Sequence, residues 1–136
     1  MNLFKKMDNE KLPQEVQFFF IAVATLQQGE YEKSLKLFNE LIDKYVDLSN
    51  PSVQVPSYYH NRSLAKSHLG NIDGAIEDLN ISINISETNE SYFELFRLYH
   101  HKGEPQNGLK YLIKAYELGN KKAEEILREN TNYFKR

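Results

Sequence analysis

Apolar residues recur along this chain at spacings of three and four, which places their side chains on one face of an α-helix. The pattern is interrupted at Gly29, Gly70 and Gly103. A glycine that follows a helix can adopt the left-handed conformation without the steric cost of a Cβ atom. The pattern therefore predicts helices on both sides of each glycine, with bounds of about 14–28, 31–46, 56–69, 72–85, 89–102, 105–118 and 121–134.

The segments around the three glycines match one another in residue type. A small residue stands five positions after each glycine, and an aromatic residue stands eleven positions before it; the small residues are Ser34, Ala75 and Gly108, and the aromatic residues are Phe18, Tyr59 and Tyr92. The small residue lets the second helix of each pair approach the first closely. Because one such helix pair cannot bury its own apolar faces, the pairs are expected to stack into a solenoid.

The pattern resembles the tetratricopeptide repeat, a helix pair of about 34 residues. The second repeat matches most fully, with Tyr59, Gly70, Ala75 and Leu79 at the expected spacing. The segment 114–123 is also similar to the related Sel-type repeats. The chain departs from the pattern in having no Trp and in placing Phe96 where a small residue is typical. The resemblance implies an all-α, right-handed α/α superhelix of three repeats with a C-terminal capping helix.

The predicted domain organisation is simple. A leader precedes a single domain, and the extra length between the first two glycines falls in a lengthened loop, 48–55, that is rich in turn residues. The bounds are 1–13 for the leader, 14–134 for the domain, about 14–47, 56–88 and 89–120 for the repeats, and 121–134 for the cap helix.

Composition excludes several classes of protein. The chain has 40% hydrophobic and 26% charged residues and a net charge of −2, which argues against disorder and against a nucleic-acid-binding surface. It contains no Cys, so disulfides and thiolate metal sites are excluded. Residues 1–13 carry no apolar run of the signal-peptide type, and the apolar stretch 18–26 is far shorter than the roughly 20 residues of a membrane span. The sequence therefore predicts a cytoplasmic protein without membrane contact.

The resemblance implies that the first helix of each pair lines a concave groove that binds a protein or peptide. The residues predicted to face this groove are Val16, Phe19, Phe20, Val23, Gln27, Ser57, His60, Asn61, Leu64, His68, Glu90, Phe93, Glu94, Arg97 and His101. The groove would be apolar at its N-terminal end and rich in histidine at its C-terminal end. The family subgroup that clamps acidic chaperone tails is excluded, because two acids and two apolar residues occupy its clamp positions. We therefore expect a ligand that is apolar at one end and basic or neutral at the other.

Three consecutive phenylalanines, 18 to 20, cannot all be buried by one helix face. We expect Phe18 to pack between helices, which leaves two interpretations for Phe19 and Phe20. A neighbouring segment covers them, with Leu3, Phe4 and Met7 of the leader as one candidate, or they form a docking patch for a partner.

The histidines and Arg62 are the remaining candidates for chemistry. His68 and His101 occupy equivalent places in adjacent repeats and are expected to approach one another near Glu94, but the spacing provides no complete metal-ligand set. No metal and no cofactor is therefore predicted, and the histidines are expected to tune binding near neutral pH. The stem of Arg62 is expected to pack while its guanidinium finds an acid or a carbonyl.

The leading hypothesis is a non-catalytic protein- or peptide-binding module, whether an adaptor, a chaperone-like protein or an inhibitory partner of the immunity type. Catalytic signatures such as a Gly-rich phosphate loop, a His-Glu-x-x-His run and a nucleophile elbow are absent. The alternative is a self-assembling protein that forms a homodimer through Phe19 and Phe20 or through the ends of the solenoid.

Overall fold

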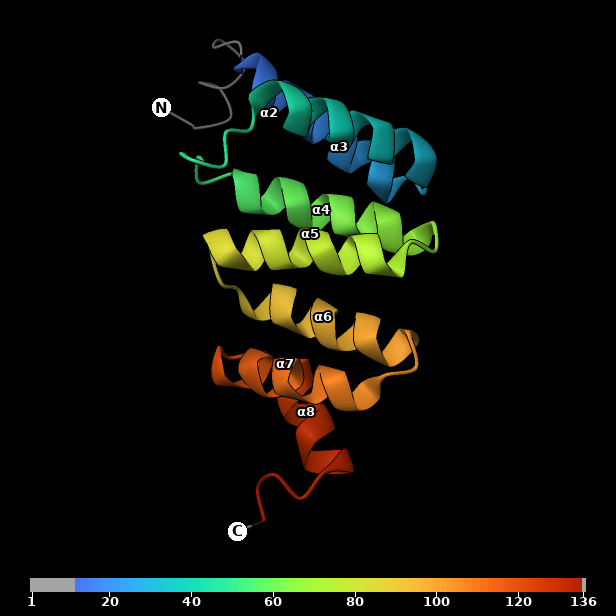
Figure 1. The fold of residues 1–136 in the computed structure, drawn as a ribbon, viewed down its shortest axis with the longest axis vertical. Helices are drawn as coiled ribbons and strands as arrows, with labels where there is room; N and C mark the ends of the chain where they lie inside the picture. The colour runs from blue at the N-terminus through green and yellow to red at the C-terminus, as the bar shows by residue number, and fades with distance from the viewer. Residues whose placement is uncertain (1–11, 136) are drawn as a thin grey trace, which may run out of the picture.

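In this computed structural model, residues 12–135 are described, and they form seven α-helices and no strand. The helices stack along the long axis of the molecule (Figure 1). Their bounds are α2 (Gln14–Gln27), α3 (Tyr31–Tyr45), α4 (Val55–His68), α5 (Ile72–Ile85), α6 (Asn89–His101), α7 (Pro105–Glu117) and α8 (Lys121–Asn130). The predicted all-α solenoid is confirmed.

Glycine turns join the two helices of each repeat. Gly29, Gly70 and Gly103 have φ values of 82°, 84° and 86°, and Gly119, between α7 and α8, has a φ of 95°. No other described residue has a positive φ. The left-handed conformation that ends a helix in this way disfavours any residue with a Cβ atom, which explains why glycine stands at each turn.

One predicted boundary is corrected by the structure, because α8 ends at Asn130 instead of 134. The other helix bounds agree with the prediction to within one residue. At the end of α8 the Thr131 hydroxyl donates to the carbonyl oxygen of Leu127 at 2.6 Å and accepts from the backbone N–H of Tyr133. These side-chain bonds replace the backbone pattern of a helix, and Thr131 is extended, with φ −138° and ψ 168°.

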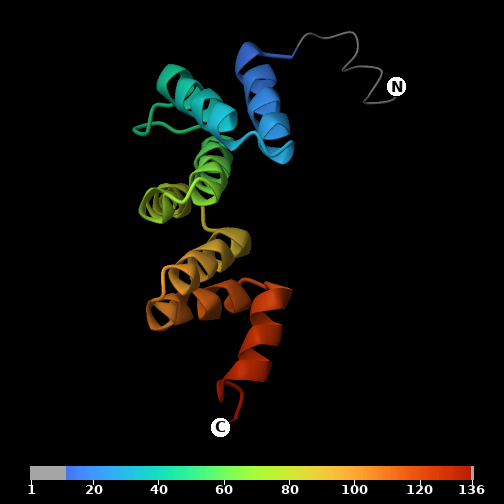
Figure 2. The same ribbon diagram turned by 90° about the vertical axis from the view of Figure 1, so that its right-hand side faces the viewer.

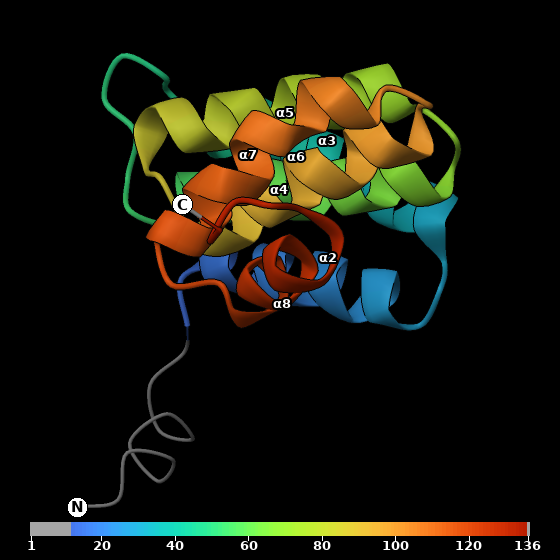
Figure 3. The ribbon, with the colours of Figure 1, turned by 90° about the horizontal axis from the view of Figure 1, so that it is seen from below.

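The helices divide into two layers. Seen from the side and from below, α3, α5 and α7 run along one side of the stack, while α2 and α8 lie on the other (Figures 2 and 3). Helices α4 and α6 lie between these two sides (Figure 3). The residues predicted to face the groove lie on α2, α4 and α6, the first helices of the three repeats.

The apolar core is divided in two. One cluster is built on α2, α3 and α4 around Phe38, Leu41 and Tyr58, and the other on α5 to α8 around Leu79 and Leu95. Where α4 meets α5 and α6, four buried polar residues lie between these clusters, and we call them the polar seam: Ser63, Asp78, Ser82 and Ser91. Every buried side-chain nitrogen or oxygen in residues 12–135 has a hydrogen-bond partner, so the seam is fully satisfied.

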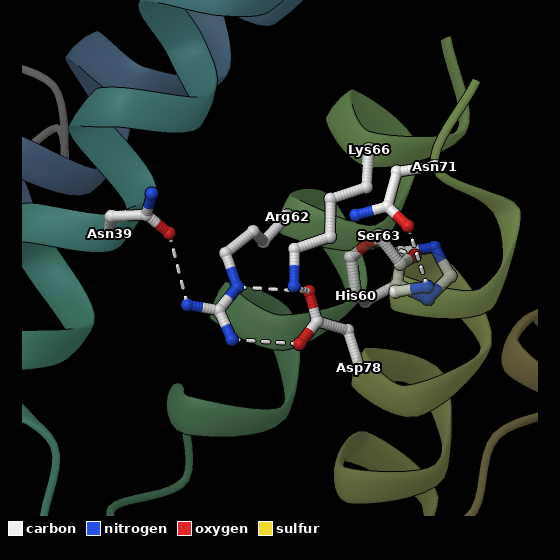
Figure 4. Close-up of polar contacts among 8 residues, drawn as sticks. Asn39, His60, Arg62, Ser63, Lys66, Asn71 and Asp78 are labelled. Carbon is white, nitrogen blue, oxygen red and sulfur yellow. Dashed lines mark hydrogen bonds and ion pairs between the residues drawn. The ribbon is translucent and has the colours of Figure 1, made fainter. Parts of the chain in front are cut away.

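Asp78 is the charged member of the seam. Its carboxylate accepts two hydrogen bonds from Arg62, at 2.9 and 2.8 Å, and forms an ion pair with Lys66 at 3.0 Å (Figure 4). Arg62 also donates to the Oδ1 atom of Asn39 at 3.1 Å, so one guanidinium joins α3, α4 and α5. Burial opposes the charge of Arg62, but the bonds and charge of Asp78 outweigh it and raise the pKa of the guanidinium. Of the two partners expected for the guanidinium of Arg62, an acid or a carbonyl, the structure shows the acid.

Candidate functional site

A hollow of about 570 Å³ lies between the C-terminal ends of α4 and α6. We call it the histidine hollow, and its lining residues are Leu64, Ser67, His68, Gly70, Glu94, Arg97, Leu98, His100 and His101. Five residues predicted to face the groove meet here: Leu64, His68, Glu94, Arg97 and His101. His68 and His101 occupy equivalent positions in adjacent repeats, and both side chains line this one hollow.

Neighbouring side chains hold the walls of the histidine hollow in place. The imidazole of His68 stacks on the ring of Tyr31 in α3, with centroids 4.2 Å apart and planes 2° from parallel. Arg97 pairs with Glu94 at 2.9 Å within α6. Glu94 is the only acid that lines the hollow, and this pairing offsets its charge. The hollow thus combines an apolar floor from Leu64 and Leu98 with polar walls, a composition typical of a binding site.

A second, smaller hollow of about 210 Å³ lies at the N-terminal ends of the same two helices. We call it the serine hollow, and it is lined by Pro56, Ser57, His60, Ser82, Thr88, Glu90 and Ser91. His60 in the serine hollow and His68 in the histidine hollow are both on α4, and the helical rise places them about 12 Å apart along its axis. Ser57 and His60 of the serine hollow recur at spacings of three and four with Leu64 of the histidine hollow, so these residues share one face of α4. We call the line between α4 and α6 that runs from one hollow to the other the trough.

His60 is held by a chain of hydroxyl groups from α6. Its Nδ1 atom lies 3.0 Å from the Ser91 hydroxyl oxygen, which accepts a hydrogen bond from the Thr88 hydroxyl, also at 3.0 Å. The hydroxyl hydrogen of Ser91 is thereby free to donate to Nδ1, which fits a neutral imidazole. Burial lowers the pKa of His60 below its usual 6.5, while the charges of Glu94 and Glu90 act in the opposite direction.

The predicted groove residues of α2 do not join the two hollows. Phe19 contacts the rings of Phe38 and Tyr58, with centroids 6.5 and 5.0 Å away, so it packs where α2, α3 and α4 meet. Phe20 is 54% exposed and Gln27 is exposed as well. Val16 and Val23 are half-buried on the same helix. Of the two interpretations left open, cover by neighbouring helices applies to Phe19, whereas Phe20 lies at the surface beside Ile21, at 59% exposure.

Two further groove candidates are held by other contacts. Phe93 packs against the core of the third repeat and lies 5.9 Å from the ring of Phe96. The side chain of Asn61 donates to the carbonyl oxygen of Ser57 one turn earlier in α4. Neither residue lines either hollow.

Sequence reasoning missed several residues of the hollows. Ser82 belongs to the second helix of its repeat, and Thr88 and Ser91 form a cap, in which the Thr88 hydroxyl accepts from the backbone N–H of Ser91. The signal for the cap was present, since Thr88 directly precedes a helix. Its position in the trough depends on how the repeats stack, which the helical period does not give.

Two other properties of the described residues bear on the class of site. Within residues 12–135, no group of three or more His, Asp or Glu side chains is arranged to hold a metal ion. In the same part of the chain, no helix combines the length and the apolar character needed to cross a bilayer.

No family model matches the chain. A TPR repeat-containing protein of Methanocaldococcus jannaschii is 33% identical over 129 residues, which cover 93% of this chain but only 21% of the relative. The chain thus spans about a fifth of that protein's length.

Two solved structures share the fold. The type III secretion translocator chaperone SycD of Yersinia enterocolitica superposes with a TM-score of 0.72 and 18% identity, over 84% of this chain and 87% of SycD. PcrH, solved in complex with the chaperone binding region of PopB, gives a TM-score of 0.68 and 13% identity, over 84% of this chain and 93% of PcrH. The repeated glycine turns and the stacked helix pairs are thus those of a tetratricopeptide-like solenoid, the fold that this chain shares with SycD and PcrH.

Proposed function

We propose that this protein is a non-catalytic binding module, of the adaptor or chaperone-like type, that holds an extended segment of a partner protein. The observation that carries the proposal is the trough between α4 and α6, with the serine hollow at one end and the histidine hollow at the other. Because residues on one face of α4 line both hollows, we expect one segment to reach both.

The separation of the hollows defines the kind of segment that fits. His60 and His68 lie about 12 Å apart along α4, and an extended chain advances about 3.3 Å per residue. Two anchor side chains about four residues apart would therefore reach the two hollows. The small serine hollow suits a short polar side chain, and the larger histidine hollow, with its floor of Leu64 and Leu98, suits a longer one.

The solved structure of PcrH with the chaperone binding region of PopB supports this proposal, because a protein of the same fold there holds a segment of a partner. At 13% identity, the two proteins are alike in fold.

Selection from a library of random short peptides displayed on phage tests the proposal. The bait is the full chain, beside a variant with Ser57→Arg in the serine hollow and Arg97→Glu in the histidine hollow. Both residues are exposed, so the variant is expected to fold. The control variant carries the same charge changes outside the hollows, Ser86→Arg and Lys122→Glu, at exposed sites.

We expect the wild type and the control to enrich peptides that share two anchor positions about four residues apart. The hollow variant should lose these peptides. Peptides that bind the hollow variant and the wild type equally would place binding elsewhere on the molecule and contradict the proposal.

A further inference from the structure

The imidazole of His68 is held flat against a ring from another repeat. It lies within 2° of parallel to the ring of Tyr31 in α3, with the two centroids 4.2 Å apart. Tyr31 is half-buried and packs against the apolar core of α2, α3 and α4, whereas His68 is exposed. An exposed side chain ordinarily samples several rotamers, and stacking on an anchored ring restricts it to one. The plane of the imidazole is therefore fixed relative to the histidine hollow.

The stacked pair of Tyr31 and His68 separates two hollows of the surface. Tyr31 lines a hollow of about 520 Å³ together with Leu69, His68 lines the histidine hollow, and the two hollows share no lining residue. Because Tyr31 covers one face of the imidazole, the opposite face is the one that remains for a molecule in the histidine hollow. This hollow thus has a flat aromatic wall beside the apolar side chains of Leu64 and Leu98.

The charges of the histidine hollow narrow the chemistry of its occupant. Apart from histidines, Glu94 and Arg97 are the only charged side chains among the described residues that line it, and they pair with each other at 2.9 Å. A carboxylate or ammonium group would compete with this existing pair, and its burial would cost hydration free energy. An aliphatic side chain would contact the leucines and leave the imidazole face without a stacking partner. An aromatic ring matches both surfaces.

We propose that the histidine hollow binds a flat aromatic side chain of the partner segment, stacked on the face of His68 opposite Tyr31. Aromatic rings favour offset stacking with centroids about 4.5–7 Å apart, so the ring would form a third layer of the stack. Tyr31 is a positioning residue, because it acts on the occupant only by holding His68. The inference rests on the proposed function and deepens it, since it names the side chain that one of the two anchors carries.

Binding of N-acetyltryptophanamide to the isotope-labelled full chain, followed by NMR, is the first test. The chain contains no Trp, so every indole signal belongs to the probe. We expect nuclear Overhauser contacts between the indole and the ring of His68, and weaker binding of N-acetylleucinamide, the aliphatic control. His68→Ala should weaken binding of the indole probe about two- to tenfold, the range that an aromatic pair contributes. Equal binding of the two probes, or binding of neither, overturns the proposal.

Substitutions of Tyr31 test its positioning role with the same probe. Tyr31→Leu should weaken indole binding in the wild-type background and have no further effect when combined with His68→Ala. Tyr31→Phe keeps the ring and should bind the probe as the wild type does. The matched control is Tyr45→Leu, which makes the same change at another half-buried tyrosine of α3 that packs against the same core. If Tyr31→Leu weakened binding equally with and without His68, Tyr31 would not act through the imidazole, and this assignment would be wrong.

The peptides selected on phage separate this inference from the proposed function. Enriched peptides should carry Phe, Tyr or Trp at the anchor whose contribution is lost in His68→Ala. Enriched peptides with an aliphatic or charged residue at that anchor would overturn the aromatic site and leave the proposed function standing. Binding of the indole probe without enrichment of any peptide would overturn the proposed function and support the aromatic site alone.

Discussion

Asp78 shows how much one side chain contributes to the joint between α4 and α5, the two helices of the second repeat. Its carboxylate is 1% exposed, yet it is fully engaged, because Arg62 and Lys66 reach it from α4. A buried acid of this kind is stable only while its partners stay in place, and the partners in turn depend on the acid. The three residues therefore act as one unit.

Replacing Asp78 by Ala should lower the free energy of unfolding by about 3–5 kcal/mol, because two half-buried cations would be left without their acid. Urea denaturation measures the loss. Asp73→Ala is the matched control: Asp73 also pairs with a lysine, Lys102 at 2.8 Å, but its side chain is 74% exposed. An exposed pair contributes at most about 1 kcal/mol, so similar losses in the two variants would refute the role given to the buried pair.

His60 makes the stability of the fold sensitive to acid. Burial lowers the pKa of His60 in the folded state below its unfolded value of about 6.5, so the neutral imidazole is favoured by folding. Its contribution is complete above pH 6.5 and is lost as the pH falls from there toward the folded pKa. The groups with charge near it are Glu90 and Glu94 of α6, while Ser82 of α5 is uncharged.

Urea unfolding at neutral and at mildly acidic pH checks this expectation. The wild type should lose stability between the two conditions, and His60→Gln should lose less, since it removes the titrating group. The control is His100→Gln, at an exposed position, which should keep the wild-type pH dependence. Equal pH dependence in wild type and His60→Gln would exclude His60 as its source.

The kind of group that satisfies Arg62 could be predicted from the sequence, whereas the contacts of Phe19 could not. A guanidinium at an otherwise apolar position has few ways to be satisfied, so an acid or a carbonyl could be expected before the structure was known. Phe19 and Phe20 are neighbours on the helix, and the helical period alone does not say where the packed surface ends and the groove begins. That boundary depends on Tyr58, which belongs to a different repeat.

At the level of elements, Gly108 explains how closely the two helices of the third repeat approach each other. A Cβ atom on Gly108 would lie 3.1 Å from the Cβ of Tyr99 and 3.2 Å from the carbonyl oxygen of Phe96. Helix α7 therefore approaches α6 more closely than an ordinary side chain would allow. The small residue expected at this position is thus explained by the backbone of α6 beside it.

Gly108→Leu should destabilise the protein by about 1–3 kcal/mol or more, because the added side chain has no space between the two helices. Thermal unfolding followed by circular dichroism gives the effect. Asn107→Leu adds the same side chain at the exposed neighbouring position and should have little effect. If both variants melted alike, close approach of α6 and α7 would not be the reason for the glycine.

Most helix boundaries were predictable because each has a local signal. Gly29, Gly70 and Gly103 end helices by their backbone conformation, and the side chain of Asn120 caps α8 by accepting from the backbone N–H of Ala123. The end of α8 was misplaced by four residues. Its determinants are the two bonds of the Thr131 hydroxyl and the packing of Tyr133 and Phe134 on Tyr116, and this tertiary contact leaves no periodic trace in the sequence.

The described part of the molecule consists of two apolar cores joined by the polar seam. Leu127 of α8 is fully buried in the core of the second half, at 0% exposure. In a solenoid each repeat contacts only its neighbours, so stability is expected to vary along the stack. A substitution that destabilises one core should therefore increase local unfolding most in the helices that build that core.

Leu127→Ala should cost about 2–5 kcal/mol and raise amide hydrogen exchange in α6, α7 and α8 more than in α2 and α3. Native-state exchange followed by mass spectrometry resolves the helices. Phe38→Leu, in the other core, should show the opposite distribution. A uniform rise in exchange along the chain in both variants would mean that the two cores unfold as one cooperative unit.

The residues of the polar seam also affect the shape of the trough. Apolar surfaces tolerate sliding because their attraction has no direction, whereas hydrogen bonds fix one alignment. The bonds from Asp78 and Ser82 to α4, and the contact of Ser91 with His60, therefore set the tilt of the second half of the molecule against the first. Families of such modules could change the width of their binding surface by exchanging a few seam residues, while the volume of both cores and the identity of every surface residue stay the same.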